Sequence, residues 1–103
     1  MKVQYHAPFS INQYLKNEVE QQLKKIDRLN FSFSEADAYF KLKDGNNSME
    51  DKEFELKIHV TGQVLFAKSH ANTFERAIPV AVEKVRRQLV KYKEGFVDRR
   101  KGR

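Results

Sequence analysis

Polar and apolar residues alternate along four stretches of the chain, which is the pattern of β-strands with one buried face. The stretches are residues 2–6, 36–43, 53–61 and 64–70. Their apolar positions include Val3, Tyr5, Ala36, Ala38, Phe40, Leu42, Phe54, Leu56, Ile58, Val60, Leu65 and Ala67. Turn-forming residues at 44–48 and a tight hairpin at Gly62-Gln63 separate the last three stretches. These three strands are therefore expected to form an antiparallel meander.

Apolar residues recur every three or four positions in the segment that follows the first strand, as in an amphipathic helix. The stripe consists of Ile11, Leu15, Val19, Leu23 and Ile26. Ser10 or Asn12 can cap the start of this helix, and the segment from Ser10 to Gln13 has the spacing of a capping box. The pattern predicts a helix that ends at about Leu29.

A second apolar stripe predicts another helix near the end of the chain. It consists of Phe74, Ala77, Ile78, Ala81, Val82, Val85, Leu89 and Tyr92. A capping box from Asn72 to Glu75 marks its start, and its end is expected at about Gly95. Pro79 lies inside the pattern, removes one backbone hydrogen bond and is expected to kink the helix locally.

The elements follow the order β-α-β-β-β-α, with one apolar face on each strand and one apolar stripe on each helix. Such a set predicts an α+β fold in which two helices cover one face of a four-stranded sheet. The other face is expected to be polar and open to water. At 103 residues the chain has the length of a single domain. We place this domain at residues 1–95 and expect residues 96–103, which show no periodicity, to form a frayed basic tail.

The composition excludes several classes of protein. With no cysteine, the chain has no disulfide, thiolate metal site, iron–sulfur cluster or thiol nucleophile. No apolar run approaches the roughly 18–20 residues that span a bilayer, and residues 1–10 lack the apolar core of a signal peptide. We therefore expect a cytoplasmic protein that is neither secreted nor inserted in a membrane.

All of the excess positive charge lies in the last fifth of the chain. The net charge is +6, and residues 84–103 alone hold nine basic and two acidic residues. Such asymmetry favours a polyanionic partner, either a nucleic acid or an anionic membrane. A solvated basic tail that aids solubility would explain the same charge, so the charge balance leaves both interpretations open.

A helical projection places basic residues on the outer faces of both expected helices, away from the apolar stripes. The group on the second helix is Arg76, Lys84, Arg87 and Lys91, accompanied by the acid Glu83. The group on the first helix is Lys24, Lys25 and Arg28. Helices packed side by side would merge these groups into one patch suited to a phosphate backbone, because each neutralised phosphate releases counterions. The alternative is that the outer face of any surface helix is charged.

Acidic residues gather around the turn between the second and third strands. They are Asp44, Glu50, Asp51, Glu53 and Glu55. They would make the domain a charge dipole that orients itself on a polyanion. An ordinary hydrophilic hairpin loop explains them equally well.

Signals for catalysis and metal binding are weak. His6, His59 and His70 share no metal-ligand spacing, although His6 and His59 are both expected on the open face of the sheet. The sequence contains no glycine-rich phosphate loop and no nucleophile motif. We expect no enzymatic activity, no metal, no cofactor and no small-molecule substrate.

Three large side chains, those of Tyr39, Val64 and Phe66, are expected to face outward on the sheet. An aromatic sheet face can stack bases, as in RNA-recognition motifs. The sequence motifs of those domains are absent and the expected topology differs, so packing at the sheet edge or a dimer contact is the favoured interpretation.

Several motifs between residues 60 and 100 occur together in one known family. The hairpin Val60-Thr61-Gly62 is followed by Leu65-Phe66-Ala67 and by the helical run from Ala77 to Leu89. Arg87-Gln88-Leu89 and Lys91-Tyr92-Lys93 stand where the family has Arg-Gln-Leu and a Lys-His-Lys-like ending. In this combination the chain resembles the ribosome hibernation-promoting factors, also called ribosome-associated inhibitors or ribosomal subunit interface proteins.

The resemblance covers about residues 2–100 and is looser in the first helix, from Leu15 to Asp27. Two residues depart from the family pattern: Pro79 replaces an acidic residue, and Tyr92 replaces a common histidine. Both departures leave the basic positions intact, so they put only the straightness of the second helix in question.

The resemblance implies a fold similar to double-stranded-RNA-binding domains and a partner in the small ribosomal subunit with its 16S-type ribosomal RNA. It also implies a site in the channel used by mRNA and tRNA, near the decoding site. Family members block translation there under stress or in stationary phase. Position by position, the implied RNA-binding residues are Lys24, Lys25, Arg28, Lys84, Arg87, Lys91 and Lys93.

The chain lacks the C-terminal dimerisation domain of the long family form, so it resembles the short form and is expected to be monomeric away from the ribosome. Whether it promotes ribosome dimers or keeps single ribosomes idle is left open. One alternative is a general module for free duplex RNA, although double-stranded-RNA-binding domains begin with a helix and this chain begins with the strand at 2–6. The other is a protein-interaction domain that uses the open sheet face through Tyr39 and Phe66.

Overall fold

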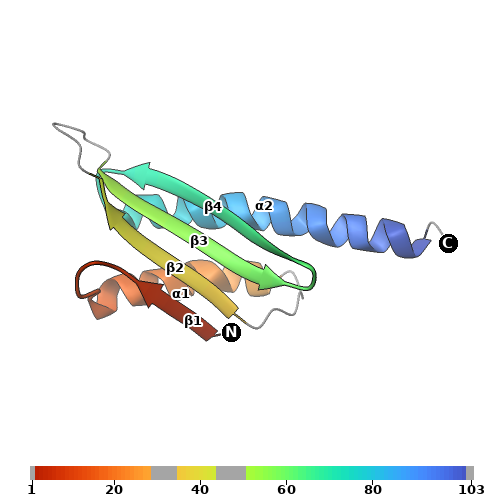
Figure 1. Cartoon of the computed structure of the whole chain (residues 1–103), viewed down its shortest axis with the longest axis horizontal. Coiled ribbons are helices and arrows are strands. Elements are labelled where there is room, and N and C mark those ends of the chain that lie inside the picture. The colour runs from red at the N-terminus through yellow and green to blue at the C-terminus, as the bar shows by residue number, and fades with distance from the viewer. Residues whose placement is uncertain (1, 29–34, 44–50, 102–103) are drawn as a thin grey trace.

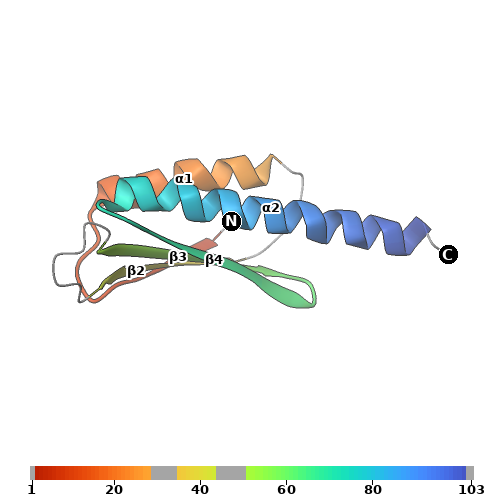
Figure 2. The same ribbon diagram turned by 90° about the horizontal axis from the view of Figure 1, so that it is seen from above.

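A four-stranded sheet and two helices make up the structure, a computed structural model that describes residues 2–28, 35–43 and 51–101, with side chains as far as Gly95. The elements are β1 (Lys2–His6), α1 (Gln13–Asp27), β2 (Glu35–Leu42), β3 (Lys52–Val60), β4 (Gln63–Ala71) and α2 (Phe74–Lys101). The sheet order is β1-β2-β3-β4, with β1 parallel to β2 and the other neighbours antiparallel. Both helices lie side by side on one face of the sheet, and the other face is open (Figure 1 and Figure 2). The predicted α+β fold and its element order are confirmed.

The strands keep the predicted alternation except at Leu42, at the end of β2, and at Glu53, which is buried near the start of β3. Leu42 was expected in the buried set, but its side chain is 52% exposed because it is the last residue of β2, at the margin of the sheet. The hairpin between β3 and β4 turns at Thr61-Gly62, one residue earlier than expected, and Val60 pairs with Gln63. Gly62 has φ of +88°, in the left-handed region that favours glycine.

Both helices start one or two residues later than their predicted capping boxes. Asn12, not Ser10, caps α1: its side-chain oxygen accepts a hydrogen bond from the backbone N–H of Leu15 at 2.9 Å. At α2 the Thr73 hydroxyl accepts from the backbone N–H of Arg76 at 3.2 Å. In each case the capping oxygen belongs to the residue directly before the helix, because only that position reaches the N–H of the third helical residue.

The second helix is longer than the sequence pattern indicates. α2 continues through Pro79 without a break and through Gly95 as far as Lys101, so residues 96–101 are helical rather than a frayed tail. No proline follows Gly95 to stop the helix, and cations near a helix C-terminus interact favourably with its dipole. As a result α2 projects well beyond the end of the sheet (Figure 1).

The hydrophobic core lies between the sheet and the helices. Phe40 on β2 packs edge-on against Phe54 on β3 and Phe74 on α2, with ring centroids 5.1 Å apart in both pairs. Leu56 in the middle of β3 and Val85 in the middle of α2 are fully buried. Every apolar residue of the predicted α2 stripe is buried except Tyr92, which is partly buried against the core.

Edge strand β1 is fastened to α1 through one tyrosine. The Tyr5 hydroxyl donates to the backbone oxygen of Lys16 and lies 3.2 Å from a carboxylate oxygen of Glu20. Burial, assisted by the negative charge of Glu20, raises the pKa of Tyr5 to about 12. Tyr5 therefore stays neutral and keeps its proton for these contacts at physiological pH.

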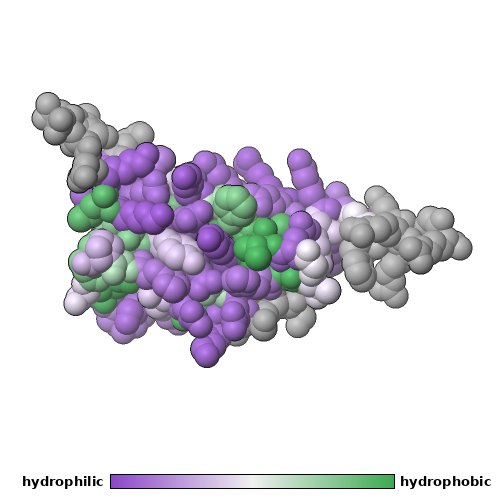
Figure 3. Space-filling model, viewed as in Figure 1, coloured by the Kyte–Doolittle hydropathy of each residue, from purple (hydrophilic) through white to green (hydrophobic). Residues whose placement is uncertain are grey.

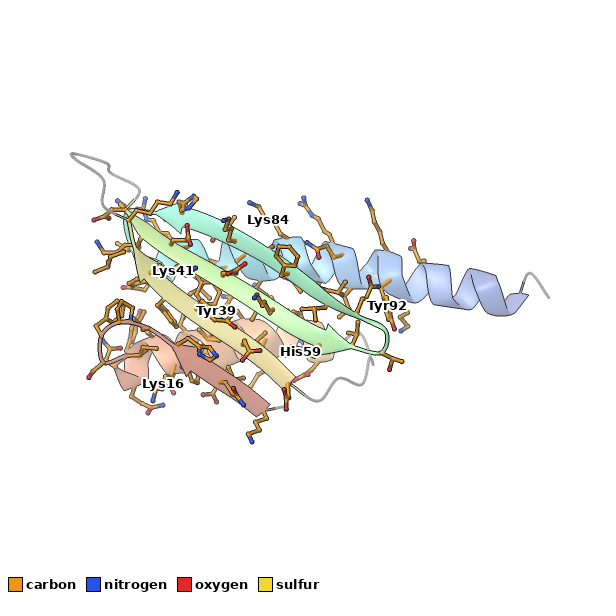
Figure 4. All side chains as sticks on the ribbon, in the orientation of Figure 1. Lys16, Tyr39, Lys41, His59, Lys84 and Tyr92 are labelled. Atoms are coloured by element: carbon orange, nitrogen blue, oxygen red, sulfur yellow. The ribbon has the colours of Figure 1, made fainter. Side chains whose placement is uncertain are left out.

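The open face of the sheet carries paired polar side chains. His6 and His59 both lie there, as expected, and their Nε2 atoms are 3.0 Å and 2.7 Å from the two carboxylate oxygens of Asp37. Tyr39 is enclosed between His6, stacked on it at 4.4 Å, and Lys57, whose Nζ is 5.0 Å from the ring centroid. Figure 4 shows Tyr39, Lys41 and His59 on this face.

The predicted cluster of acids near the β2–β3 turn is largely neutralised where the structure describes it; Asp44 and Glu50 lie outside the described residues. The Glu53 carboxylate, only 7% exposed, lies 2.7 Å from His70 Nε2 and within 4.0 Å of the ammonium groups of Lys41 and Lys43. Asp51 is bonded to Lys52, and Glu55 stands opposite Lys68 on β4. A strong acidic pole is therefore not found among these residues.

Replacing Leu56 by alanine tests the strand register. Leu56 is fully buried on the helix-covered face of the sheet, so Leu56→Ala should reduce the free energy of unfolding by about 2–5 kcal/mol. Val64→Ala, an exposed position on the opposite face of β4, is the matched control and should change it by no more than about 0.5 kcal/mol. Urea titrations measure both values, and equal small losses would show that the register is wrong.

The histidine contacts of Asp37 predict a dependence of stability on pH. The hydrogen bond with His6 is the largest cause that lowers the pKa of Asp37; partial burial opposes it, and His59 lowers the pKa further. Such a carboxyl stabilises the fold above its unfolded pKa of about 3.9, and this contribution is lost as the pH falls through the lower folded value. Asp37→Asn should therefore flatten the loss of stability below about pH 4. Urea midpoints measured from pH 6 to pH 2.5 decide the matter, since parallel curves for the two proteins contradict the expectation.

Candidate nucleic-acid interface

A row of basic side chains runs along the outer side of α2. Lys84, Arg87 and Lys91 are separated by three and four residues, so they follow one another along the same side of the helix. All three are exposed, and the Arg87 side chain is 73% exposed. The helix that carries the row extends past the end of the sheet (Figure 2). The helix therefore presents successive cations where nothing in the described chain covers them.

The acid Glu83 lies within this surface and is paired with the neighbouring Arg86. Arg86 holds Glu83 through both carboxylate oxygens at 2.7–3.0 Å, whereas Arg87 Nε is 3.6 Å away. The hydrogen bond from Arg86 is the largest cause that lowers the pKa of Glu83; desolvation opposes it, and the charges of Arg86, Arg87 and Lys25 lower the pKa further. The same contact raises the pKa of Arg86. The charge of Arg86 is thus largely offset, and Arg87 keeps most of its own.

The three candidate residues of α1 do not share one direction. Lys25 lies close enough to α2 for its positive charge to help lower the pKa of Glu83. Lys24 instead borders a shallow hollow on the β1 side of the helix, together with Val3, Glu20, Leu23 and Asp27. Arg28 is exposed and directly follows the last residue of α1. The charge of Lys25 therefore acts towards α2, whereas Lys24 lies beside the acids Glu20 and Asp27 on the β1 side.

Lys93 likewise lies away from the row on α2. It is exposed, but nine residues at 100° each put it on the opposite side of the helix from Lys84. Of the seven residues implied by the resemblance, Lys84, Arg87 and Lys91 therefore form one exposed row on α2, and the charge of Lys25 acts on Glu83 beside it. Lys24, Arg28 and Lys93 are exposed around it.

Three residues of α2 fasten the helix to the backbone of edge strand β4 and its hairpin. Lys84 Nζ donates to the Lys68 carbonyl at 3.2 Å, Gln88 Nε2 donates to the Phe66 carbonyl at 2.8 Å, and the Tyr92 hydroxyl donates to the Thr61 carbonyl at 2.5 Å. Figure 4 shows Lys84 and Tyr92 on the side of α2 that follows β4. These donors occupy carbonyls that an edge strand would otherwise offer to another chain.

Gln88 was not singled out from the sequence, although one signal was available. Lys84, Gln88 and Tyr92 are spaced four residues apart beside the apolar stripe, which marks a polar flank that faces a neighbouring element. Lys84 has two roles, because its ammonium group also donates a hydrogen bond to the Lys68 carbonyl inside the protein.

The structure offers little for catalysis. Within the described ranges, no group of three or more histidine, cysteine, aspartate or glutamate side chains is arranged to hold a metal ion. The histidines instead contact carboxylates on the open sheet face. Among the described helices, none is both long and apolar enough to cross a membrane.

Two solved structures have the same fold. The ribosomal subunit interface protein from Coxiella burnetii has a TM-score of 0.75 and 20% sequence identity, over 91% of this chain and 99% of that one. The Thermus thermophilus Protein Y N-terminal domain has a TM-score of 0.69 and 17% identity, over 88% of this chain and 94% of that one. At these identities the likeness concerns the fold alone.

Sequence comparison gives the family. No curated protein sequence matches this chain. The family model described as sigma 54 modulation protein / S30EA ribosomal protein matches residues 1–95, which include every element of the sheet, all of α1 and most of α2. This chain therefore belongs to the sigma 54 modulation protein / S30EA ribosomal protein family, as its resemblance to ribosome-associated proteins indicated.

Proposed function

We propose that this protein binds the ribosomal RNA of the small ribosomal subunit and blocks translation by occupying the channel for mRNA and tRNA near the decoding site. The observation that carries the proposal is the exposed row of Lys84, Arg87 and Lys91 on a helix that projects beyond the sheet. Membership in a family of ribosome-associated proteins supports it. So do the structural relatives, one of which is described as a ribosomal subunit interface protein.

The geometry suits binding to a phosphate backbone. Arg87 and Lys91 are one helical turn apart, about 6 Å along the helix axis, so their charges can follow successive phosphates of one strand. Arginine can also hold a phosphate through two hydrogen bonds. Lys25 on α1 widens the basic surface across both helices, which matches a groove between RNA segments better than a single contact point.

The proposed action is steric and requires no chemical step. A folded domain in the path of mRNA and tRNA excludes both for as long as it stays bound, so no metal, cofactor or small-molecule substrate is needed. We place this action in the cytoplasm, where ribosomes work, and under stress or in stationary phase, when idle ribosomes accumulate. A role as a general duplex-RNA binder or as a protein adaptor is the alternative that the following experiments separate.

Removing two cations from the row should weaken ribosome binding without unfolding the protein. The double variant Arg87→Ala with Lys91→Ala should bind small subunits less tightly and flatten the log–log salt dependence of the affinity by roughly one to two units. Its free energy of unfolding should stay within about 0.5 kcal/mol of the unmodified protein because both positions are exposed. Co-sedimentation with isolated subunits across a salt series provides the measurement.

The control for this variant removes the same charge from elsewhere. Lys2→Ala with Lys43→Ala deletes two exposed cations of the sheet. The carboxylate of Glu53 keeps its contacts with Lys41 and His70 in this control. An equal loss of affinity in both double variants would indicate non-specific attraction, and a loss in the sheet variant alone would show that the helices do not face the RNA.

The amount of protein needed for inhibition distinguishes a blocking protein from an enzyme. Because the proposed block lasts only while the protein is bound, added protein should reduce cell-free translation in proportion to its ratio to ribosomes. Full inhibition at a small fraction of the ribosome concentration would instead reveal turnover and contradict the proposal. Titration of the protein into a reaction with a known ribosome concentration gives the answer.

A further inference from the structure

The open face of the sheet is hydrophilic except for an apolar patch on β4. Figure 3 shows this patch as green atoms over β4, surrounded by purple hydrophilic residues. It consists of Val64 and Phe66, whose side chains are 43% and 55% exposed. Leaving a phenylalanine ring in water on an edge strand has a free-energy cost. The cost is explained if the ring has a partner.

Phe66 has a mainly basic surround. Lys57 is its direct partner on β3, and Lys68 is the next residue on the same face of β4. Lys84 of α2 reaches the backbone of Lys68 at 3.2 Å. Glu55, diagonally across the sheet, is the nearest acid by register. The Lys57 ammonium group lies over Tyr39, so Lys68 and Lys84 are the cations left beside Phe66. An apolar ring next to two lysines fits a ligand that has both a planar face and negative charge.

The two outward aromatic rings of the sheet differ in how accessible they are to a ligand. Tyr39 is covered on its faces by the stacked ring of His6 and by the ammonium group of Lys57. Phe66 remains exposed, and its backbone is held by the hydrogen bond from Gln88 at 2.8 Å. A ring on a backbone held in this way is presented in a fixed position, which lowers the entropy lost on stacking.

The phenylalanine is also connected to the proposed RNA-binding surface. Gln88 and Lys84 lie between Phe66 and the outer side of α2, where Arg87 and Lys91 stand. A nucleic-acid strand that follows these cations therefore meets the edge of β4 next. Beyond that edge the first exposed ring is that of Phe66.

We propose that Phe66 is a stacking platform for an unpaired base of single-stranded RNA, whose backbone passes over the outer edge of β4 across Lys84 and Gln88. The inference rests on the proposed function and adds the kind of RNA segment and the residue that holds it. Bases stack on exposed aromatic rings beside basic grooves without sequence preference. A second copy of the chain is a poorer occupant, because a symmetric contact would bring the lysines around Phe66 against each other.

Two substitutions at Phe66 separate stacking from simple apolar contact. Phe66→Leu keeps an apolar side chain but loses the ring, and Phe66→Tyr keeps the ring. Base stacking on an aromatic side chain accounts for about 1–3 kcal/mol, so Phe66→Leu should weaken binding of a 12-nucleotide single-stranded RNA by roughly 5- to 150-fold. Phe66→Tyr should stay within about twofold, and the salt dependence should not change in either variant because no charge is removed. Fluorescence anisotropy with labelled RNA measures these affinities.

Val64→Thr is the matched control, since it keeps the shape of the neighbouring side chain and removes its apolar character. The inference predicts little change in RNA affinity for this variant. Equal affinity for RNA in Phe66→Leu and the unmodified protein would overturn the inference. So would a concentration-dependent dimer, detected by sedimentation, that both Phe66→Leu and Val64→Thr disrupt.

Binding to intact small subunits, measured in parallel, tests the proposed function independently of the stacking inference. If Phe66→Leu binds single-stranded RNA and subunits normally while the Arg87 and Lys91 double variant loses both, the stacking inference fails and the proposed function stands. If the unmodified protein does not bind small subunits at all, the proposed function fails, and with it the ribosomal setting of this inference.

Discussion

Burial of the apolar side of α2 against the sheet is the constraint on which the rest of the structure depends. Residues such as Ile78, Val85 and Leu89 are fully buried, and this fixes the rotation of the helix about its own axis. Every other side chain of α2 then has a direction set by the 100° step between residues. Arg87 and Lys91 must point outward, and Gln88 must meet the edge of β4. The basic row is therefore a consequence of core packing.

Charged side chains are paired differently on the open face of the sheet and on α2. On the open face, carboxylates are held by histidines and lysines, as in the contacts of Asp37 with His6 and His59. Paired charges of this kind keep the β1 and β2 side of this face hydrophilic, whereas Lys68 and Lys84 make the β4 edge basic. On α2, the acid Glu83 is held mainly by Arg86, and the cations beside it stay exposed. The cations available to a polyanion thus lie on α2 and along the neighbouring edge of β4.

The edge of β4 is where these two surfaces meet. Lys84 and Gln88 satisfy backbone carbonyls of the edge strand, so the strand is protected from pairing with another chain while its side chains remain accessible. This arrangement explains how an exposed Phe66 can be tolerated on an edge strand. It also makes Lys84 part of the internal hydrogen bonding as well as of the basic row.

The sequence by itself determined the elements, their order and the layer to which each apolar residue belongs, because strand and helix periodicity are local properties of the chain. It also determined that cations lie on the outer side of α2. Only the tertiary structure decided that Lys24 lies beside acids on the β1 side of α1, that Glu53 is buried among cations and that Tyr39 is covered while Phe66 is not. It likewise decided which residue caps each helix and that α2 continues past Gly95. The physical reason is that these outcomes depend on side chains far apart in the sequence, or on competition between neighbouring capping residues, and periodicity carries no information about either.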